Sequence, residues 1–366
     1  MNSNRKIRVG IVGANAERGW ARDAHLPALR HLPDDFELAA ISARTQELAD
    51  QARAAFGASL AFGDSYALAQ SAGIDLVVVA VKVPEHRAIV LAALHAGKHV
   101  MCEWPLGRDL AEAEEMAAAA GASSHVMIGL QGLSAPAIQQ AAKLVQSGAI
   151  GKPIVSRIFS PTAGWGTAVP ANYAYLQDKR NGATLETIMG GHTLAAIEAI
   201  VGAYTELDAR CTILRAEAQL RGTGTSVARS CADHMIVTGR HNSGCVSTLE
   251  VVGGTADRPF TFELHAEHGW LRIAGHNPGG YQTGPLTLET SVAGCSVPEH
   301  ESNGLTGPAI NLAASYAQFA QDIRLGTRTA PDFHRAHDLS LLLDHIEKAS
   351  AAGYRQYPNL ARQSPN

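Results

Sequence analysis

The chain has 366 residues, with 30 Lys and Arg against 34 Asp and Glu, and a formal net charge of −4. This length accommodates two domains, each with its own core. Because the charges nearly balance, no basic field is available to hold nucleic acid or an anionic membrane. The composition therefore excludes nucleic acid and membrane as expected partners and favours small molecules or other proteins.

Cysteine usage and hydropathy indicate the compartment. The cysteines are scattered, odd in number and form no CxxC pair, which argues for reduced thiols and against a disulfide framework or a zinc site. They are Cys102, Cys211, Cys231, Cys245 and Cys295. No signal peptide opens the chain, and no apolar run approaches the roughly 20 residues of a membrane span. We expect a soluble, cytoplasmic protein without a bound metal.

The first part of the chain alternates apolar runs with Ala-rich helical patterns, which is typical of a parallel sheet with crossover helices. Strands are predicted over residues 7–12, 37–42, 75–81, 98–102 and 125–129. Helices are predicted over residues 46–56, 85–96 and 109–120. We therefore expect an N-terminal α/β domain over residues 1–131.

The first of these strands runs into a glycine-containing turn. The segment VGIVGANAERGW, Val9 to Trp20, breaks from an apolar run into a charged, helix-forming stretch. In a dinucleotide fingerprint one glycine allows the tight turn and a second lets the backbone approach the pyrophosphate. Gly13 fits the first role, but Asn15 stands at the second position and Gly19 implies a longer loop. By itself the motif fits a phosphate-binding loop or a surface turn after a buried strand.

After Gly132 the pattern changes. A helix is predicted over residues 135–146, and strands over 154–159, 206–214, 233–238, 244–251, 261–266 and 269–273. Strands joined by short turns, without a helix between each pair, indicate an antiparallel sheet. Further helices are predicted over 192–201, 310–325 and 335–352, and a loop-rich segment over 277–307. We place a second domain at residues 132–366.

The segment VVVAVKVPEHRAIVLAALHAGKHVMCEWPLG, Val77 to Gly107, resembles the glucose-fructose oxidoreductase, inositol dehydrogenase and rhizopine-catabolism (Gfo/Idh/MocA) family of nicotinamide-dependent oxidoreductases. VGIVGANAERGWARDAHLPAL, LQGLSAP and GGHTLAAI look most like a subgroup that includes the galactose-regulon repressor of yeast, a non-enzymatic relative that binds NAD(P) and a protein partner. The resemblance implies an N-terminal Rossmann domain and a C-terminal α/β domain. It also implies that the open, mostly antiparallel sheet of the second domain packs in homo-oligomers.

The end of the second strand predicts the cofactor. An NAD-preferring Rossmann fold places a carboxylate there to hold the ribose 2′-hydroxyl. This chain has Ala43 at that position, flanked by Ser42 and Arg44. A hydroxyl and a guanidinium suit a 2′-phosphate, so we expect a preference for NADP, with NAD as the alternative. Arg44 as a solvated loop cation is the competing interpretation.

The catalytic residues of the family are only partly present. The resemblance implies a Lys after Glu103 and an Asp four residues before a His, but Trp104 and Ile188 occupy those positions. His192 remains, and a neutral imidazole can exchange a proton with a substrate hydroxyl. We expect His192 to act as acid/base, helped by Tyr175, with a helix-start histidine and a core tyrosine as the structural alternatives.

The remaining site residues follow from the resemblance and from position. Trp104, Trp165, Tyr175 and His192 are the expected substrate contacts, with a core role as the alternative for Trp165. The expected cofactor contacts are Gly13, Asn15, Gly19, Trp20, Ser42, Arg44, Val81, Lys82, His86, Glu103, Trp104 and Gln131. His25 is expected to pack between helices, and His86 to be structural rather than catalytic.

Two functions remain open at this point. The first is an NAD(P)-dependent oxidoreductase that transfers a hydride to or from a hydroxyl or carbonyl carbon of a sugar, lactol or related polar cyclic compound. The second is a catalytically silent, NADP-binding sensor or regulatory protein. The missing Lys and Asp favour the second, whereas the retained His192 favours the first.

Overall fold

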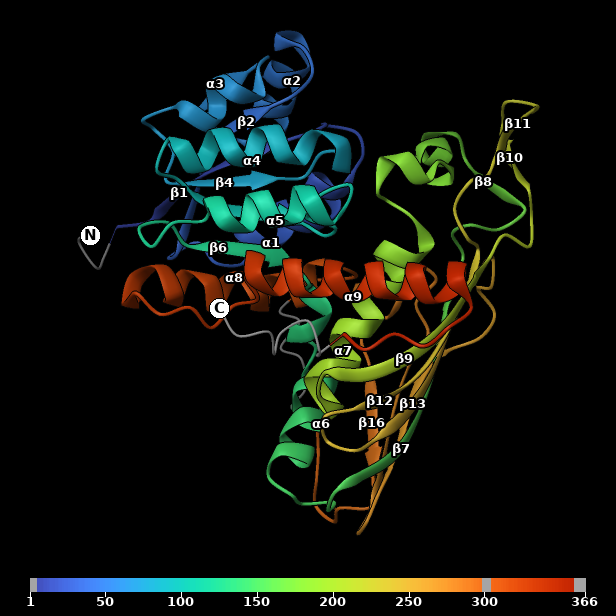
Figure 1. Cartoon of the computed structure of the whole chain (residues 1–366). Helices are drawn as coiled ribbons and strands as arrows, with labels where there is room; N and C mark the ends of the chain where they lie inside the picture. The colour runs from blue at the N-terminus through green and yellow to red at the C-terminus, as the bar shows by residue number, and fades with distance from the viewer. Residues whose placement is uncertain (1–4, 298–303, 359–366) are drawn as a thin grey trace. The chain divides into compact units, whose positions relative to one another are not determined.

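A computed structural model of the chain describes residues 5–297 and 304–358, which divide into two compact units (Figure 1). Unit 1 comprises residues 1–131 and 302–337, and unit 2 comprises residues 132–301 and 338–366. The chain leaves unit 1 after Gln131. It returns with α8 (Ala309–Leu325), which the sequence placed in the second domain, because Tyr316 and Phe319 pack into the core of unit 1.

Unit 1 contains a six-stranded parallel sheet with the order β3-β2-β1-β4-β5-β6. Its strands are β1 (Ile7–Val12), β2 (Phe36–Ser42), β3 (Leu60–Phe62), β4 (Leu76–Val79), β5 (His99–Glu103) and β6 (Val126–Gly129). The strand order changes direction at β1, with β2 on one side and β4 on the other. β4 is buried throughout, as expected for a strand covered on both faces. The predicted Rossmann fold is confirmed.

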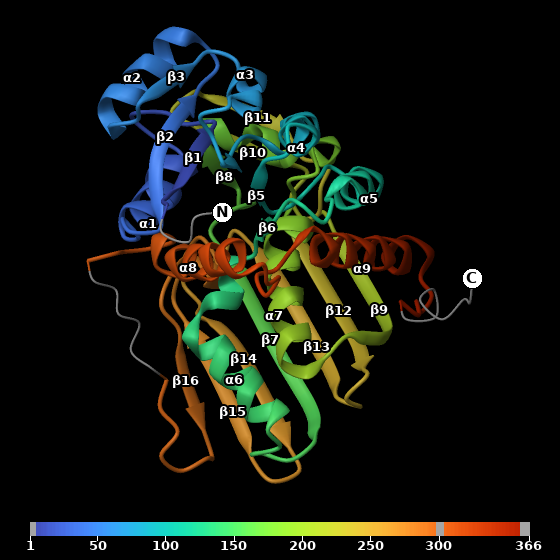
Figure 2. The ribbon, with the colours of Figure 1, turned by 90° about the vertical axis from the view of Figure 1, so that its left-hand side faces the viewer.

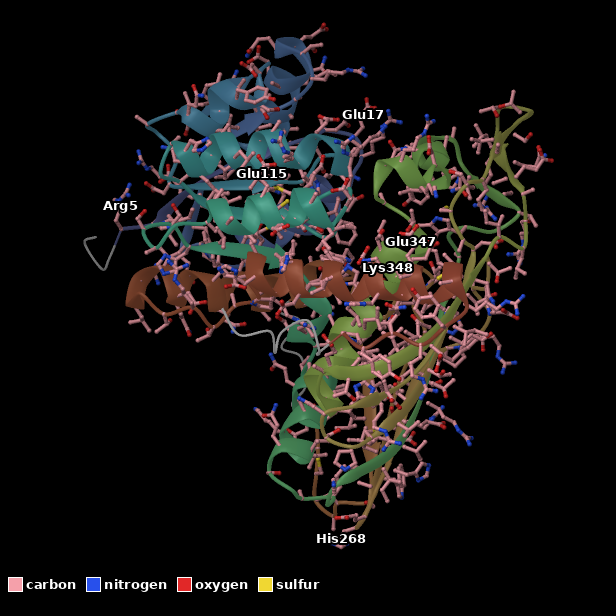
Figure 3. All side chains as sticks on the ribbon, viewed as in Figure 1. Arg5, Glu17, Glu115, His268, Glu347 and Lys348 are labelled. Atoms are coloured by element: carbon pink, nitrogen blue, oxygen red, sulfur yellow. The ribbon has the colours of Figure 1, made fainter. Side chains whose placement is uncertain are left out.

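Helices connect these strands. They are η1 (Ala21–His25), α1 (Leu26–Arg30), α2 (Gln46–Phe56), α3 (Ser65–Gln70), η2 (Val83–Glu85), α4 (His86–His95) and α5 (Leu110–Ala119). Local chemistry fixes their ends: Thr45, Asp64 and Asp109 accept backbone N–H groups at the starts of α2, α3 and α5. On the outer surface, Glu115 of α5 accepts from Arg87 of α4 at 2.6 Å (Figure 3). β3 and α3 were not predicted, because three to six residues are too few for a periodic pattern.

Unit 2 is built on a seven-stranded sheet with the order β16-β15-β14-β7-β13-β12-β9. Its strands are β7 (Pro153–Thr162), β9 (Tyr204–Thr212), β12 (His234–His241), β13 (Val246–Gly253), β14 (Phe260–Ala266), β15 (Trp270–Gly275) and β16 (Thr287–Thr290). β7 and β13 pair in parallel, and the other neighbours pair antiparallel. The predicted mostly antiparallel sheet is confirmed, although β16 falls in the segment expected to be loop-rich.

The other elements of unit 2 include helices on one face of this sheet, where α6 and α7 lie (Figure 2). Its helices are η4 (Ala171–Gln177), η5 (Lys179–Asn181), η6 (Leu185–Gly190), η7 (Tyr281–Thr283), α6 (Pro136–Gln146), α7 (Gly191–Val201) and most of α9 (Phe333–Ala352). η3 (Gln131–Ser134) begins in unit 1. A small second sheet combines β8 (Ala168–Pro170), β10 (Glu217–Arg221) and β11 (Thr225–Ala228).

Two further observations concern the cysteines and the hydrophobicity of the helices. All five cysteines are free thiols. Among the residues that the structure describes, no helix combines the length and the apolar character that crossing a bilayer requires.

Candidate functional site

The carboxyl ends of parallel strands meet at one edge of the unit 1 sheet, and ligands of such sheets bind where the strand order reverses. β1 ends before Gly13, β2 at Ser42, β4 two residues before Val81, and β5 at Glu103. The topology therefore brings most of the predicted cofactor contacts to this one edge. It does so although they are spread over about a hundred residues of sequence.

Gly13 has no room for a side chain. Its φ is +92°, in the left-handed region, and an added Cβ would lie 2.7 Å from Ala80 O and 2.7 Å from Val81 Cγ1. Its N–H and that of Ala14 both donate to Ser42 O at 3.1 Å. The turn after β1 is thereby packed against both neighbouring strands, as the first glycine of a dinucleotide loop requires.

Asn15 organises the loop that follows. Its Oδ1 accepts from Glu17 N at 2.9 Å and from Arg18 N at 3.1 Å. This is the local turn that Asn favours through side-chain to backbone hydrogen bonds. Gly19 has a φ of +104° with no atom within 4 Å of an added Cβ, so it serves the backbone conformation rather than packing. Trp20 packs against the core of unit 1, and its buried indole N–H has no partner within the described ranges.

The end of β2 offers one buried and one exposed polar group. Ser42 is fully buried, and its hydroxyl lies 3.3 Å from Ser65 Oγ. Arg44 is exposed, and no hydrogen bond or ion pair to it occurs among residues 5–297 and 304–358. The guanidinium is therefore accessible to an external anion, whereas the Ser42 hydroxyl is buried against Ser65 at the start of α3.

His86 joins two of the loops at this edge. Its Nε2 lies 3.1 Å from Val81 O, and its Nδ1 lies 3.0 Å from Pro105 O and 3.2 Å from Leu106 O. The ring is 1% exposed, and burial lowers the pKa of His86. The ring lies between the β4–α4 turn and the segment after β5. His86 therefore positions these loops.

The remaining predicted cofactor contacts are mostly buried. Trp104 is 5% exposed and Gln131 is 2% exposed, with no hydrogen-bond partner for Gln131 Oε1 in the described part of unit 1 or unit 2. Lys82 is exposed at the start of η2. The Glu103 side chain is 15% exposed. A Cβ added at Gly129 would lie 2.9 Å from its Oε1. The glycine at the end of β6 therefore makes space for this carboxylate.

In unit 2, His192 lies in the first turn of α7 and is 4% exposed. Its carbonyl accepts from the Tyr281 hydroxyl at 2.7 Å, which anchors the backbone of this turn. Burial lowers the pKa of His192 to about 3, with no charged group contributing. Its Nδ1 is buried and has no hydrogen-bond partner in the described residues. An unpartnered buried nitrogen of this kind costs about 1–3 kcal/mol.

Two other predicted residues lie in the segment 163–177 of unit 2. Trp165 is 5% exposed, has a φ of +54°, and its indole N–H donates to Leu176 O at 3.1 Å. Burial raises the pKa of Tyr175 to about 12. Tyr175 therefore keeps its proton at neutral pH and can donate a hydrogen bond. Trp165 uses its only polar group to hold η4, the segment that carries Tyr175.

No carboxylate replaces the Asp that Ile188 displaces. The nearest acidic residue in sequence is Glu186, whose Oε1 accepts from Ala232 N at 2.9 Å. Burial raises the pKa of Glu186, and its charge contributes to the raised pKa values of Cys211 and Cys231. It is not among the causes of the pKa shift of His192. The imidazole thus lacks an acidic partner that would orient it and favour its protonation.

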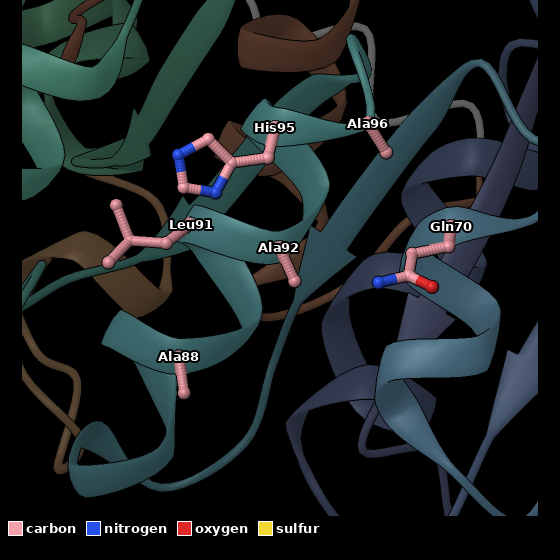
Figure 4. A pocket seen from close by; sticks show the side chains of 6 residues that line it. All are labelled: Gln70, Ala88, Leu91, Ala92, His95 and Ala96. Carbon is pink, nitrogen blue, oxygen red and sulfur yellow. The ribbon is translucent and has the colours of Figure 1, made fainter.

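A groove on unit 1 lies apart from this edge (Figure 4). It is lined by Gln70 of α3 and by Ala88, Leu91, Ala92, His95 and Ala96 on or just after α4. His95 and Ala96 lie at the C-terminal end of α4, whereas the carboxyl edge of the sheet leads into the N-terminal end of that helix. The groove is therefore distinct from the predicted cofactor contacts.

Sequence reasoning missed three residues that support the candidate site. Glu112 binds the backbone N–H of Arg108 at 2.8 Å and holds the segment after β5. Tyr316, which lies in α8, contacts His25, and the Tyr281 hydroxyl donates to the carbonyl of His192. Tyr316 and Tyr281 are far in sequence from the groups they contact, and no local motif marks them. Glu112 is four residues from Arg108, a spacing that suggests an ion pair but not its role in this loop.

Two family models match the chain in succession. Residues 7–130 match the model of the oxidoreductase family with an NAD-binding Rossmann fold. Residues 136–275 match the model of the C-terminal domain of Gal80p. The two matches divide the chain close to the position where its structure passes from unit 1 to unit 2.

Curated relatives fall in two functional groups. The dehydrogenase AclE of Aspergillus oryzae is 31% identical over 272 residues, 73% of this chain and 68% of that protein. The galactose/lactose metabolism regulatory protein GAL80 of Saccharomyces cerevisiae is 30% identical over 291 residues, 74% of this chain and 67% of that protein. The matched regions thus span about two thirds of these relatives.

Solved structures share the fold. A super-repressor mutant of Gal80p from Saccharomyces cerevisiae superposes with a TM-score of 0.85 at 24% identity, covering 98% of this chain and all of that chain. Levoglucosan dehydrogenase in complex with NADH and levoglucosan superposes with a TM-score of 0.80 at 21% identity, covering 96% and 99%. Both a regulator and an enzyme are built on this architecture, so the fold does not decide between them.

Proposed function

Because the chain belongs to the oxidoreductase family with an NAD-binding Rossmann fold, we propose that it is an NAD(P)-dependent oxidoreductase. Its substrate would be a hydroxyl or carbonyl compound of the sugar, lactol or polar cyclic class. A nicotinamide dinucleotide would supply the carbon that accepts or donates the hydride. The residues of this chain would bind that cofactor, orient the substrate and move one proton.

Unit 1 fits the cofactor. Gly13 allows the tight turn after β1, because a Cβ there would lie 2.7 Å from both Ala80 O and Val81 Cγ1. Helix N-termini such as the one after Trp20 carry N–H groups without intrahelical acceptors, which suit a phosphate. Arg44 would hold a 2′-phosphate, and His86 would keep the Val81 and Pro105 loops in place around the dinucleotide.

The unpartnered Nδ1 of His192 carries the proposal of catalysis. A buried imidazole nitrogen without a partner is stabilised when a ligand hydroxyl reaches it. Burial lowers the pKa of His192 to about 3, so the ring is neutral at physiological pH and can accept a hydrogen bond from a substrate hydroxyl. In this proposal it would take the hydroxyl proton as the hydride leaves during oxidation and return it during reduction. Tyr175, a phenol with a pKa of about 12, would serve as a hydrogen-bond donor to the substrate oxygen.

A turnover assay tests this proposal. The purified protein is incubated with NADP or NAD and a panel of aldoses, polyols and lactols, and the absorbance of the reduced nicotinamide is followed. We expect turnover by the wild type and a loss of about 100-fold or more in kcat in His192→Asn, because general acid–base catalysis contributes about 10²–10⁴-fold. His268→Asn, in the exposed turn between β14 and β15, is the matched control. Full activity of His192→Asn would remove this residue from the mechanism.

Arg44 allows a separate test of the NADP preference. Charge-assisted hydrogen bonds contribute about 1.5–3 kcal/mol, so Arg44→Ala should weaken NADP binding about 10- to 100-fold and leave NAD binding unchanged. Arg53→Ala, an exposed arginine of α2 that pairs with Asp50, is the control. Dissociation constants of the wild type that favour NAD over NADP would contradict the preference.

A second candidate function is a cofactor-binding regulatory protein without catalysis. The replacement of the family Lys and Asp by Trp104 and Ile188 favours it, since neither side chain exchanges protons. So does the lack of a charged group acting on the pKa of His192. Micromolar or tighter binding of a dinucleotide without turnover on any substrate, together with a protein partner recovered in a pull-down, would support this function over the first.

We further propose that the exposed sheet face of unit 2 joins two copies of the chain. Trp270, His265, Val155 and Val246 are neighbours in register across four strands, and Trp270 and Val246 are each 41% exposed. Size-exclusion chromatography with light scattering should give a homo-oligomer for the wild type and a smaller species for Trp270→Glu. A wild-type monomer at micromolar concentration would contradict this proposal.

A further inference from the structure

A buried polar chain lies behind Glu103 in unit 1. Three elements contribute one residue each: Tyr316 from α8, His25 from η1 and Glu103 from β5. The Tyr316 hydroxyl lies 2.7 Å from His25 Nδ1, and His25 Nε2 lies 3.0 Å from Glu103 Oε1. His25 and Tyr316 are fully buried, whereas the Glu103 side chain retains 15% exposure.

The direction of the hydrogens follows from the chemistry of the two ends. Burial and the nearby charge of Glu103 raise the pKa of Tyr316 well above its ordinary value, so the phenol keeps its proton. Because a carboxylate only accepts hydrogen bonds, the Glu103 side favours a hydrogen on His25 Nε2 and leaves Nδ1 to accept from the Tyr316 hydroxyl. A neutral imidazole that accepts on Nδ1 carries its hydrogen on Nε2. That hydrogen faces the Glu103 carboxylate.

His25 Nε2 faces Glu103 Oε1 at 3.0 Å in this structure. The ring N–H is not aligned with the carboxylate oxygen, so neither atom has a hydrogen-bond partner among the described residues. No other hydrogen bond within the described ranges competes for either atom. The position of the carboxylate therefore depends on the imidazole, and the tautomer of the imidazole depends on the Tyr316 hydroxyl.

Glu103 is held on its other side by the end of β6. Its Oε1 lies where a Cβ of Gly129 would be only 2.9 Å away, so this oxygen is enclosed between β6 and His25. Because Oε1 is buried, the exposed part of the side chain is elsewhere, at the carboxyl edge of the sheet. A carboxylate held in this way can accept a hydrogen bond from a ribose hydroxyl or a carboxamide N–H.

We propose that Tyr316 and His25 are positioning residues that orient the Glu103 carboxylate for dinucleotide binding, so that helix α8 contributes to the cofactor affinity of the N-terminal sheet. This inference rests on the proposed function, because it requires a dinucleotide at this edge of unit 1. Neither residue touches the cofactor in this arrangement. Both act through Glu103.

The test removes one oxygen atom. Tyr316→Phe deletes the hydroxyl and keeps the ring, and nitrogen-15 NMR of the histidines reports the tautomer of His25 in the whole protein. We expect a single Nε2–H tautomer in the wild type, its loss in the variant, and about 5- to 30-fold weaker NADP binding, since one hydrogen bond contributes about 1–2 kcal/mol. Tyr204→Phe, which removes another fully buried hydroxyl in unit 2, should leave NADP affinity unchanged.

A double-mutant cycle separates positioning from general stability. If Tyr316 acts through Glu103, then Tyr316→Phe should cause no further loss of NADP affinity in a Glu103→Gln background. Additive losses would overturn the inference, as would an unchanged tautomer and affinity in Tyr316→Phe. Failure of the wild type to bind either dinucleotide would overturn the proposed function and, with it, this inference. The two failures are thus distinguishable by the wild-type measurement.

Discussion

The buried histidines of the two units differ in what surrounds their ring nitrogens. In unit 1, His86 lies between three carbonyl oxygens, and its ring links two loops. In unit 2, His241 is equally occupied, with Gly202 O at 2.7 Å from one nitrogen and Ser247 Oγ at 2.8 Å from the other. His192 is as buried as these two, yet its Nδ1 has no partner in the described residues. Of these three residues, His86 and His241 use both ring nitrogens in contacts that hold the fold, whereas His192 does not use Nδ1.

The largest expected effect is in unit 1, at the tightly packed turn after β1. Gly13→Ala adds a Cβ that would lie 2.7 Å from Ala80 O at a positive φ. We expect a loss of about 2–4 kcal/mol in the free energy of unfolding and loss of measurable dinucleotide binding, because strain and overpacking combine.

Gly19→Ala is the matched control for that variant. Its φ is +104°, but no atom lies within 4 Å of the added Cβ. Only the backbone penalty applies there, about 1–2 kcal/mol. Denaturant unfolding and calorimetric binding of both variants measure the difference. Equal effects at the two positions would mean that the packing of Gly13 against β4 has no role in cofactor binding.

Lowering the pH should weaken the fold through its buried histidines. Burial lowers the pKa of His99 to about 4, with a contribution from the charge of His125, and burial lowers that of His241 to about 4. Between about pH 6.5 and 4 these histidines are protonated in the unfolded chain but remain neutral in the folded protein. The free energy of unfolding therefore falls as the pH falls. Each such histidine costs up to about 1.4 kcal/mol per pH unit in that window.

Unfolding midpoints in urea at a series of pH values measure this slope. In His99→Asn the slope between pH 6.5 and 4 should be shallower than in the wild type, because one of the titrating groups is gone. An identical slope in the variant would show that His99 titrates normally in the folded protein.

A carboxylate placed near His192 should raise the pKa of its imidazole. Ile188→Asp places an acid one helical turn before His192, where family enzymes are expected to carry one. Since an opposite charge within about 4–6 Å favours the charged imidazole, the pKa of His192 should rise by about one to three pH units. NMR titration measures it, and Ile188→Asn supplies the same shape without the charge. A pKa that stays near 3 in the Asp variant would show that residue 188 does not face the ring.

The smallest expected effect concerns the loop after β1. Asn15→Ala removes an oxygen that accepts two backbone N–H groups, and we expect dinucleotide affinity to fall about 3- to 10-fold, because loop order accounts for about 1 kcal/mol. Asp64→Ala removes the cap of α3 in the same unit and should reduce stability without changing affinity. A larger loss of affinity in Asp64→Ala than in Asn15→Ala would contradict this role of Asn15.

Much of unit 1 could be predicted because its signals are local. An apolar run such as 76–79 stays buried in any arrangement of a parallel sheet, and the turn at Gly13 needs a residue that tolerates a positive φ. The alternation of strands and helices then fixes which ends of the strands share an edge. This pattern predicts the edge of the sheet, whereas the individual cofactor contacts expected there came from the family resemblance and remain predictions.

The sequence by itself determined the two-part architecture, the parallel and antiparallel sheets and the family to which the chain belongs, since each depends on periodicity or on contiguous motifs. Only the tertiary structure decided that α8 belongs to unit 1, that Tyr316 meets His25, and that Nδ1 of His192 has no hydrogen-bond partner among the described residues. The contact between Tyr316 and His25 joins residues 291 positions apart. Such contacts depend on how buried side chains fill the same space, and no local pattern encodes that.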